Sequence, residues 1–138
     1  MTKITIRPRI LDASAETVFD WLSDFRNFEP LMPDAVKDWQ ASPSGCKLKL
    51  GALGPISMEQ KKLTRPSELL IGDAEGKPFP FSLIISIKEI DASHSEVGMS
   101  FEAKLNPFLK MMVEKPLEGF LGHLLKTAQQ KLAAKANP

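Results

Sequence analysis

The sequence predicts one α+β domain over residues 1–138, with a sheet of strands wrapped around a long C-terminal helix. Three observations support this prediction. The length of 138 residues suits a single domain that buries its own core. Residues 35–105 consist mainly of strand-like segments separated by turn residues, and apolar residues recur at helical spacing from residue 109 onward. No repeat, low-complexity stretch or linker divides the chain.

The chain is expected to begin with a strand followed by two short helices. Residues 4–10 alternate between apolar and polar side chains, a period of two that is typical of a half-buried strand. Pro8 in this run indicates an edge position or a bulge, because proline cannot donate a ladder hydrogen bond. Ser14 is a suitable N-cap for the first helix, and Asp24 for a second that ends at Phe28, ahead of the next proline.

Four short strands are expected next, with turn residues between them. In the second of these, Cys46, Leu48 and Leu50 alternate with lysines, so one face is buried and the other is exposed to solvent. The predicted strands are residues 36–41, 46–50, 56–63 and 68–71, with turns at 42–45, 51–55 and 65–67 and a loop at 72–78.

The clearest hairpin joins residues 79–88 to residues 97–105. Both segments alternate, with Ile84 as an apolar residue on the outward face, and Asp91-Ala92-Ser93-His94 between them has the composition of a hairpin loop. The outward-facing positions of the sheet are polar: Lys47, Lys49, Ser82, Ser86, Lys88, Glu102 and Lys104.

The last element is a long amphipathic helix. Asn106 is a suitable N-cap and Pro107 a suitable first helical residue. Pro116 removes one backbone hydrogen bond, so we expect it to kink the helix or divide it in two. The apolar stripe that should face the sheet is Leu109, Met112, Val113, Pro116, Phe120 and Leu124.

The composition is that of an ordinary globular domain, with 43% hydrophobic and 25% charged residues. A formal net charge of +1 gives no strong electrostatic case for nucleic acid or an anionic membrane as partner. The lone Cys46 has no partner for an internal disulfide and is expected to be a small buried apolar residue. Because residues 1–7 lack the features of a signal peptide and no segment approaches the roughly 20 apolar residues of a spanning helix, we expect a cytoplasmic location.

The order of these elements resembles the START-like, or Bet v 1-like, helix-grip (SRPBCC) superfamily. The resemblance is most specific in residues 18–29, VFDWLSDFRNFE, which read like the family's opening helix pair. Residues 106–110, NPFLK, and Pro116-Leu117 are similar to the closing helix of bacterial polyketide cyclase/dehydrase-like members. The resemblance implies a seven-stranded antiparallel sheet that grips the final helix around an apolar cavity. Because family members include carriers, cyclases and Hsp90 activators, the fold alone does not select a function.

The resemblance favours a ligand cavity over a solid core made from the same residues. Gln60 shares the strand parity of Met58 and could offer an amide to a ligand, although a strand end open to solvent explains it equally well. The candidate lining residues are Phe28, Trp39, Met58, Gln60, Phe81, Leu83, Met99, Phe101, Met112, Pro116, Phe120 and His123.

No complete catalytic or metal-binding motif is present in the sequence. His123 flanks the apolar stripe and is the one weak candidate for a proton donor, since imidazole titrates near pH ~6.5; the alternative is an inert boundary histidine. The two histidines and one cysteine lack metal-ligand spacing, and no cofactor is expected. The polar cluster of Asp24, Arg26, Asn27 and Glu29 is interpreted as helix capping with local ion pairing.

Three functions are compatible with these features, in order of preference. The first is binding or transport of a hydrophobic small molecule, lipid-like or polyketide-like, in an internal cavity. The second is a cyclase or dehydratase acting on such a ligand, with His123 as the acid–base group. The third, an Hsp90-activator-like interaction module, would need a large apolar patch on the outer sheet face or on the helix, and the polar outward face of the sheet argues against it.

Overall fold

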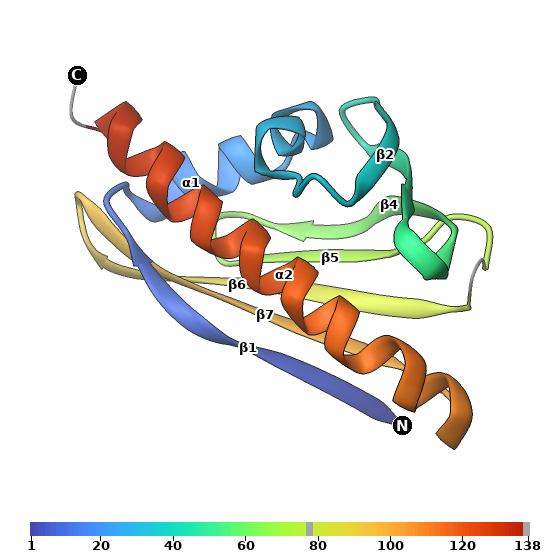
Figure 1. The fold of residues 1–138 in the computed structure, drawn as a ribbon. Coiled ribbons are helices and arrows are strands. Elements are labelled where there is room, and N and C mark those ends of the chain that lie inside the picture. Colours follow the sequence, from blue (N-terminus) through green and yellow to red (C-terminus); the bar gives the residue numbers. More distant parts are fainter. Residues whose placement is uncertain (77–78, 137–138) are drawn as a thin grey trace.

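The computed structural model describes residues 1–76 and 79–136, which form a curved antiparallel sheet with one long helix across a face (Figure 1). The described residues contain seven strands in the order β1-β7-β6-β5-β4-β3-β2. This arrangement confirms the predicted fold class. The strands are β1 (Thr2–Leu11), β2 (Val36–Ala41), β3 (Gly45–Leu50), β4 (Pro55–Thr64), β5 (Glu68–Asp73), β6 (Phe81–Asp91) and β7 (His94–Ala103).

Strand β1 lies at one edge of the sheet, where it pairs only with β7. The register shifts between Ile6 and Arg9, and this irregularity includes Pro8. Both features were predicted from the proline, because an edge strand and a bulge each tolerate a residue without an N–H group.

The β6–β7 hairpin is confirmed, with a tighter turn than the sequence suggested. Strand β6 continues to Asp91 and β7 starts at His94, so only residues 92 and 93 form the turn. The Asp91 carboxylate accepts a hydrogen bond from the Ser93 N–H at 2.8 Å, and this bond closes the turn. The pairing of β6 with β7 therefore continues to Asp91 and His94, several residues closer to the turn than the sequence predicted.

Two short helices, α1 (Ala15–Leu22) and the 3₁₀ helix η1 (Phe25–Leu31), cover one end of the sheet. Ser14 and Asp24 cap them as predicted, each accepting a hydrogen bond from a backbone N–H. The predicted end at Phe28 is wrong, because η1 continues through Pro30. A proline φ near −65° is compatible with a 3₁₀ helix, so this proline did not end the element.

Helix α2 (Pro107–Ala136) runs along the sheet without a break, so Pro116 does not divide it. Its N-terminus is capped by Asn106, whose side chain accepts from the Leu109 N–H at 2.8 Å. Toward its other end, the side-chain oxygen of Gln129 accepts a hydrogen bond from the Arg9 guanidinium at 2.9 Å, and its amide nitrogen donates to the Ile10 carbonyl at 2.8 Å. These two bonds hold the helix to β1.

The buried face of α2 differs from the predicted stripe in its first two turns. Val113, Phe120 and Leu124 are buried as expected, but Met112 and Pro116 are exposed. The first turns carry apolar residues on both faces, so the apolar periodicity there did not define one side. The buried face consists of Val113, Leu117, Phe120, Leu121, Leu124, Leu125, Ala128 and Leu132.

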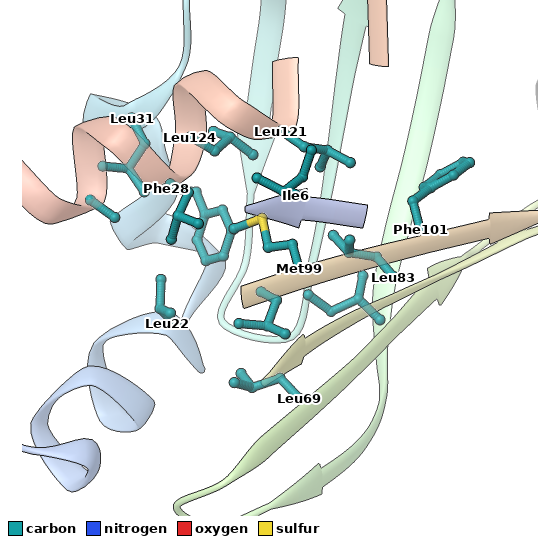
Figure 2. Packing of buried hydrophobic residues seen from close by; sticks show 14 of the residues in the cluster. Ile6, Leu22, Phe28, Leu31, Leu69, Leu83, Met99, Phe101, Leu121 and Leu124 are labelled. Atoms are coloured by element: carbon teal, nitrogen blue, oxygen red, sulfur yellow. The ribbon is translucent and has the colours of Figure 1, made fainter. Parts of the chain in front are cut away.

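The core fills the space between α2, the helix pair and the concave face of the sheet. Figure 2 shows Leu121 and Leu124 of α2, Phe28 and Leu31 of η1, and strand residues such as Leu83 and Met99 projecting into this space. Among the described helices, none combines the length and the apolar character needed to span a lipid bilayer.

Candidate functional site

An apolar cavity lies in the core, between α2, η1 and the sheet. Its volume is about 30 Å³, enough for no more than a few water-sized atoms. Every residue that lines it is apolar: Phe25, Phe28, Leu48, Leu53, Ile56, Met58, Ile71, Phe79, Phe81, Leu83, Phe101, Leu117, Phe120, Leu121 and Leu124.

The period of two in the strands explains the apolar character of the cavity wall. Leu48 on β3 and Leu83 on β6 are buried, while Lys47 and Lys49 beside Leu48 are exposed and Ser82 beside Leu83 is half-buried. Three phenylalanines close one side of the cavity. The rings of Phe81 and Phe101 stack with centroids 5.4 Å apart, and Phe79 meets both edge-on at 6.5 Å.

An open groove lies beside the cavity, between α2 and the segment that joins β3 to β4. Its volume is about 400 Å³, which is in the range of small-molecule binding sites. The groove is lined by Pro33, Ala35, Leu50, Gly51, Leu53, Met112, Lys115, Pro116, Gly119, Phe120 and His123. Leu53 and Phe120 line both spaces, so these two residues lie where the cavity adjoins the groove.

The sheet side of the groove depends on a short 3₁₀ turn, η2 (Gly51–Leu53). Gly51 and Gly54 have φ angles of +49° and +72°, a region that disfavours other residues. The Leu50 N–H donates to the Gly54 carbonyl at 3.1 Å, and the Gly54 N–H donates to the Gly51 carbonyl at 3.2 Å. This closed turn places Leu53 against the mouth of the cavity.

The helix side of the groove offers a flat wall with a few polar groups. Because Pro116 has no N–H, it cannot donate the usual helical hydrogen bond to the carbonyl of Met112. A Cβ atom added to Gly119 would meet no heavy atom within 4 Å, so the glycine leaves open space at the groove floor. Lys115 and His123 supply exposed side chains at the margin.

The structure brings nine of the predicted site residues to these two spaces. Met112, Pro116 and His123 line the groove, and Phe120 lines both spaces. The cavity wall contains Phe28, Met58, Phe81, Leu83, Phe101 and Phe120. Trp39, Gln60 and Met99 line neither space: Met99 packs within the core, and Trp39 borders a shallow surface depression beside Lys47 and Lys49.

Gln60 bonds to the protein backbone. Its amide nitrogen donates to the carbonyl of Ser23 and, at 3.3 Å, to that of Pro43. These bonds join β4 to the α1–η1 junction and to the β2–β3 turn. The side chain is thus used in holding the helix pair against the sheet.

Sequence reasoning missed part of the lining, for reasons that differ by element. Leu48, Ile56 and Ile71 follow the period of two and could have been found from strand alternation. Leu117, Leu121 and Leu124 follow helical spacing but were not predicted as lining residues. Leu117 and Leu121 also lay outside the predicted stripe, which was rotated toward Met112 and Pro116. Leu53 lies in a turn, where no periodic signal predicts burial.

The polar cluster of Asp24, Arg26, Asn27 and Glu29 lies outside the cavity lining. Asp24 bonds the guanidinium of Arg26 at 2.6 Å, and Asn27 donates to the Trp21 carbonyl at 2.8 Å, consistent with capping and local pairing. In the described part of the chain, no three His, Cys, Asp or Glu side chains are grouped to hold a metal ion. Burial raises the pKa of the Cys46 thiol to about 12, so this cysteine is protonated at neutral pH.

Comparisons with known proteins identify the fold. No family model matches the sequence, and no curated protein matches it significantly. A START superfamily protein from Mycobacterium smegmatis superposes with a TM-score of 0.72 at 20% identity, covering 96% of this chain and 98% of that one. Norcoclaurine synthase from Thalictrum flavum gives a TM-score of 0.77 at 12% identity, covering 97% and 96%.

A third similar structure is the di-domain ARO/CYC protein BexL of the BE-7585A biosynthetic pathway. It superposes with a TM-score of 0.75 at 11% identity, and the match covers 100% of this chain and 48% of the longer BexL chain. Identities this low establish the architecture and leave the activity open. The seven-stranded sheet, the opening helix pair and the long closing helix give this chain the START-like, or Bet v 1-like, helix-grip fold.

Proposed function

We propose that this protein binds a hydrophobic small molecule in the groove, with an apolar part of the ligand passing between Leu53 and Phe120 into the cavity. The observation that carries the proposal is the direct contact of the two spaces. An entirely apolar interior adjoins a solvent-open groove of about 400 Å³, with two residues lining both. Similar structures that include a START superfamily protein and an ARO/CYC protein support the same class of function.

The sizes of the two spaces indicate how the ligand is held. A cavity of about 30 Å³ is too small for a lipid or a polyketide, whereas ligand sites usually occupy several hundred cubic ångströms. Binding therefore requires that Leu53 and Phe120 move and that the cavity widens. Leu53 is suited to this role because it is only half-buried and lies on a short turn between two glycines.

The chemistry of the walls defines the ligand class. The cavity offers only apolar contacts, so the inner part of the ligand is hydrocarbon or aromatic. The groove adds the Met112 carbonyl as an acceptor, and the Lys115 and His123 side chains at its margin. A molecule with an apolar body and a hydroxyl or carboxylate at one end matches this distribution.

A matched pair of glycine substitutions tests whether the groove binds the ligand. Gly119 lines the groove and Gly122 does not, yet a Cβ at either position would meet no atom within 4 Å. Gly119→Leu should weaken binding of the neutral fluorophore N-phenyl-1-naphthylamine at least about tenfold, because the leucine fills the groove. Gly122→Leu should bind it as the wild type does. Equal binding by both variants, or no binding by the wild type, would contradict the proposal.

A second candidate function is catalysis on the same ligand by a cyclase-type or dehydratase-type reaction. The observation that favours it is the position of His123 on the groove wall, within reach of solvent and of a bound ligand's polar end. His123→Gln should then abolish turnover of an aromatic polyketide-type substrate without weakening its binding. Unchanged turnover in this variant would remove His123 from any catalytic role.

A further inference from the structure

The first two turns of α2 expose three large apolar side chains on one face. Phe108, Met111 and Met112 are 65%, 76% and 48% exposed, respectively. Their spacings of three and four residues align them on the helix side opposite the buried Val113 and Leu117. We refer to Phe108, Met111 and Met112 as the α2 patch.

This exposure is unusual because the solvent face of a helix is normally polar. Single exposed apolar residues need no explanation, but three neighbouring ones on one helical face mark an interaction surface. The patch also lies at an end of the molecule, at the start of α2 and beside the N-terminal end of β1 (Figure 1). Because its side chains are largely exposed, the patch is accessible to a partner.

The charges around the patch are predominantly positive. Exposed lysines at positions 104, 110 and 115 lie within four residues of it. The carboxylate of Glu114 lies 4.0 Å from the Lys110 ammonium group, so these two charges offset each other and Lys104 and Lys115 remain as the excess positive charge beside the patch; Glu118 lies one turn farther along the helix. The net charge of +1 for the whole chain thus conceals a small basic region at this end.

We propose that the α2 patch docks the protein on a lipid surface that carries anionic headgroups. Phenylalanine and methionine side chains that protrude between lysines match an interface with an apolar interior and negatively charged headgroups. A second copy of this chain is a less suitable partner, because both copies would bring the same excess of lysines, at positions 104 and 115, to the contact.

This inference rests on the proposed function for its biological purpose. The position of the patch next to the groove connects the two. Met112 belongs to the patch and also lines the groove, and Lys115 and Pro116 continue from it along the groove wall. Docking through the patch would place the groove at the membrane surface, where hydrophobic molecules are dissolved. The ligand could then exchange between the bilayer and the protein without crossing water.

Vesicle binding tests the proposal with residues that do not line the groove. The wild type should co-sediment with vesicles of phosphatidylcholine and phosphatidylserine in equal amounts, and more weakly with vesicles of phosphatidylcholine alone. Phe108→Ser combined with Met111→Ser should reduce binding to the mixed vesicles at least about tenfold. Ile90→Ser is the matched control and should bind as the wild type does. Ile90 is 49% exposed and lies next to the β6–β7 turn, at the end of the hairpin away from the patch.

Charge and orientation give two further readouts. Lys104→Glu combined with Lys110→Glu should remove the preference for the mixed vesicles, with a loss of roughly tenfold in binding. The tryptophan of a Phe108→Trp variant should shift its emission to the blue when mixed vesicles are added, whereas an Ile90→Trp variant should show no added shift.

The outcomes separate this inference from the proposed function. If the wild type binds N-phenyl-1-naphthylamine in buffer but does not bind either kind of vesicle, the docking proposal is overturned and the proposed function stands. Dimerisation that the Phe108→Ser, Met111→Ser variant abolishes, without vesicle binding, would overturn it and assign the patch to a second copy. Equal vesicle binding by that variant and by Ile90→Ser would also overturn the proposal.

Discussion

The aromatic cluster of Phe79, Phe81 and Phe101 contributes both to the stability of the core and to the wall of the cavity. Phe101 is 4% exposed, stacks on Phe81 at 5.4 Å and meets Phe79 edge-on at 6.5 Å. Its ring lies next to a cavity that the surrounding side chains do not fill completely. A change at this residue therefore affects folding and ligand binding together.

Replacing Phe101 with alanine should lower the free energy of unfolding by about 3–5 kcal/mol, because the buried ring is lost and the cavity grows. Chemical denaturation with urea measures this change. The enlarged cavity should also bind N-phenyl-1-naphthylamine at least as tightly as the wild type does, if the variant is assayed under folding conditions. A loss below about 1 kcal/mol would mean that the core collapses around the site and that the aromatic cluster is not a rigid wall.

Cys46 should be unreactive in the folded protein. The side chain is buried on β3, and the burial raises its pKa to about 12. Because the thiolate is the nucleophile, the folded protein should react with a disulfide reagent at pH ~8 at least roughly a hundredfold more slowly than the unfolded protein. Equal rates would show that β3 opens readily or that Cys46 is accessible to solvent.

At the scale of elements, the β6–β7 hairpin contains a pH-sensitive contact. His94 Nδ1 lies 2.8 Å from Asp91 Oδ1, and His94 Nε2 lies 3.7 Å from Asp12 Oδ1 in the β1–α1 segment. The hydrogen bond with Asp91, and then the negative charges of Asp91 and Asp12, raise the pKa of His94 above its ordinary value of 6.5. The same hydrogen bond lowers the pKa of Asp91 below 3.8.

The direction of each shift determines how this contact depends on pH. Because the pKa of His94 is raised on folding, its stabilisation is fully present below pH 6.5 and is lost as the pH rises through the raised pKa. Because the pKa of Asp91 is lowered on folding, its stabilisation is present above pH 3.8 and is lost as the pH falls through the lowered pKa. The hairpin is thus most strongly held between these two limits.

Asp91→Asn should lower the pKa of His94, as measured by NMR titration of its imidazole protons. The melting temperature of the wild type should fall between about pH 6 and pH 8, as His94 loses its proton. This fall should be smaller in the variant. Since both side chains are exposed at the surface, the effect on the melting temperature should be small. An unchanged His94 pKa in this variant would show that the contact does not persist in solution.

The elements also show how far the sequence predicts the fold. Three features follow from local chemistry and are present in the structure: the alternation in β6 and β7, the Asn106 cap and the Pro8 irregularity. The orientation of α2 was predicted less well, because Phe108, Met111 and Met112 give its first turns a second apolar face. Local periodicity does not tell which of two apolar faces is covered by the sheet.

At the scale of the whole molecule, the site depends on distances that no sequence pattern contains. The cavity and the groove adjoin at Leu53 and Phe120, which are 67 positions apart in the sequence and come from a turn and a helix. The sequence predicted part of the strand wall, including Phe81, Leu83 and Phe101, because alternation fixes which face is buried. It did not predict the size of the cavity, because shifts of a fraction of an ångström in many side chains decide how much space remains.

Three features of the molecule adjoin one another around α2. The α2 patch, the groove and the cavity follow one another and share Met112 and then Phe120 between neighbours. In our account, a hydrophobic molecule enters at the patch, occupies the groove and inserts its apolar part into the core. Each part has a separate test, through Phe108, Gly119 and Phe101, respectively.

The central claim, that the protein holds a hydrophobic small molecule, is tested most directly by native mass spectrometry of the protein as purified without detergent. Organic extraction and mass analysis of the bound material would follow. We predict a mass above that of the chain by one small molecule, with an apolar extract that carries a single polar group. A purified protein with the mass of the chain alone, which also fails to take up added N-phenyl-1-naphthylamine, would contradict the claim.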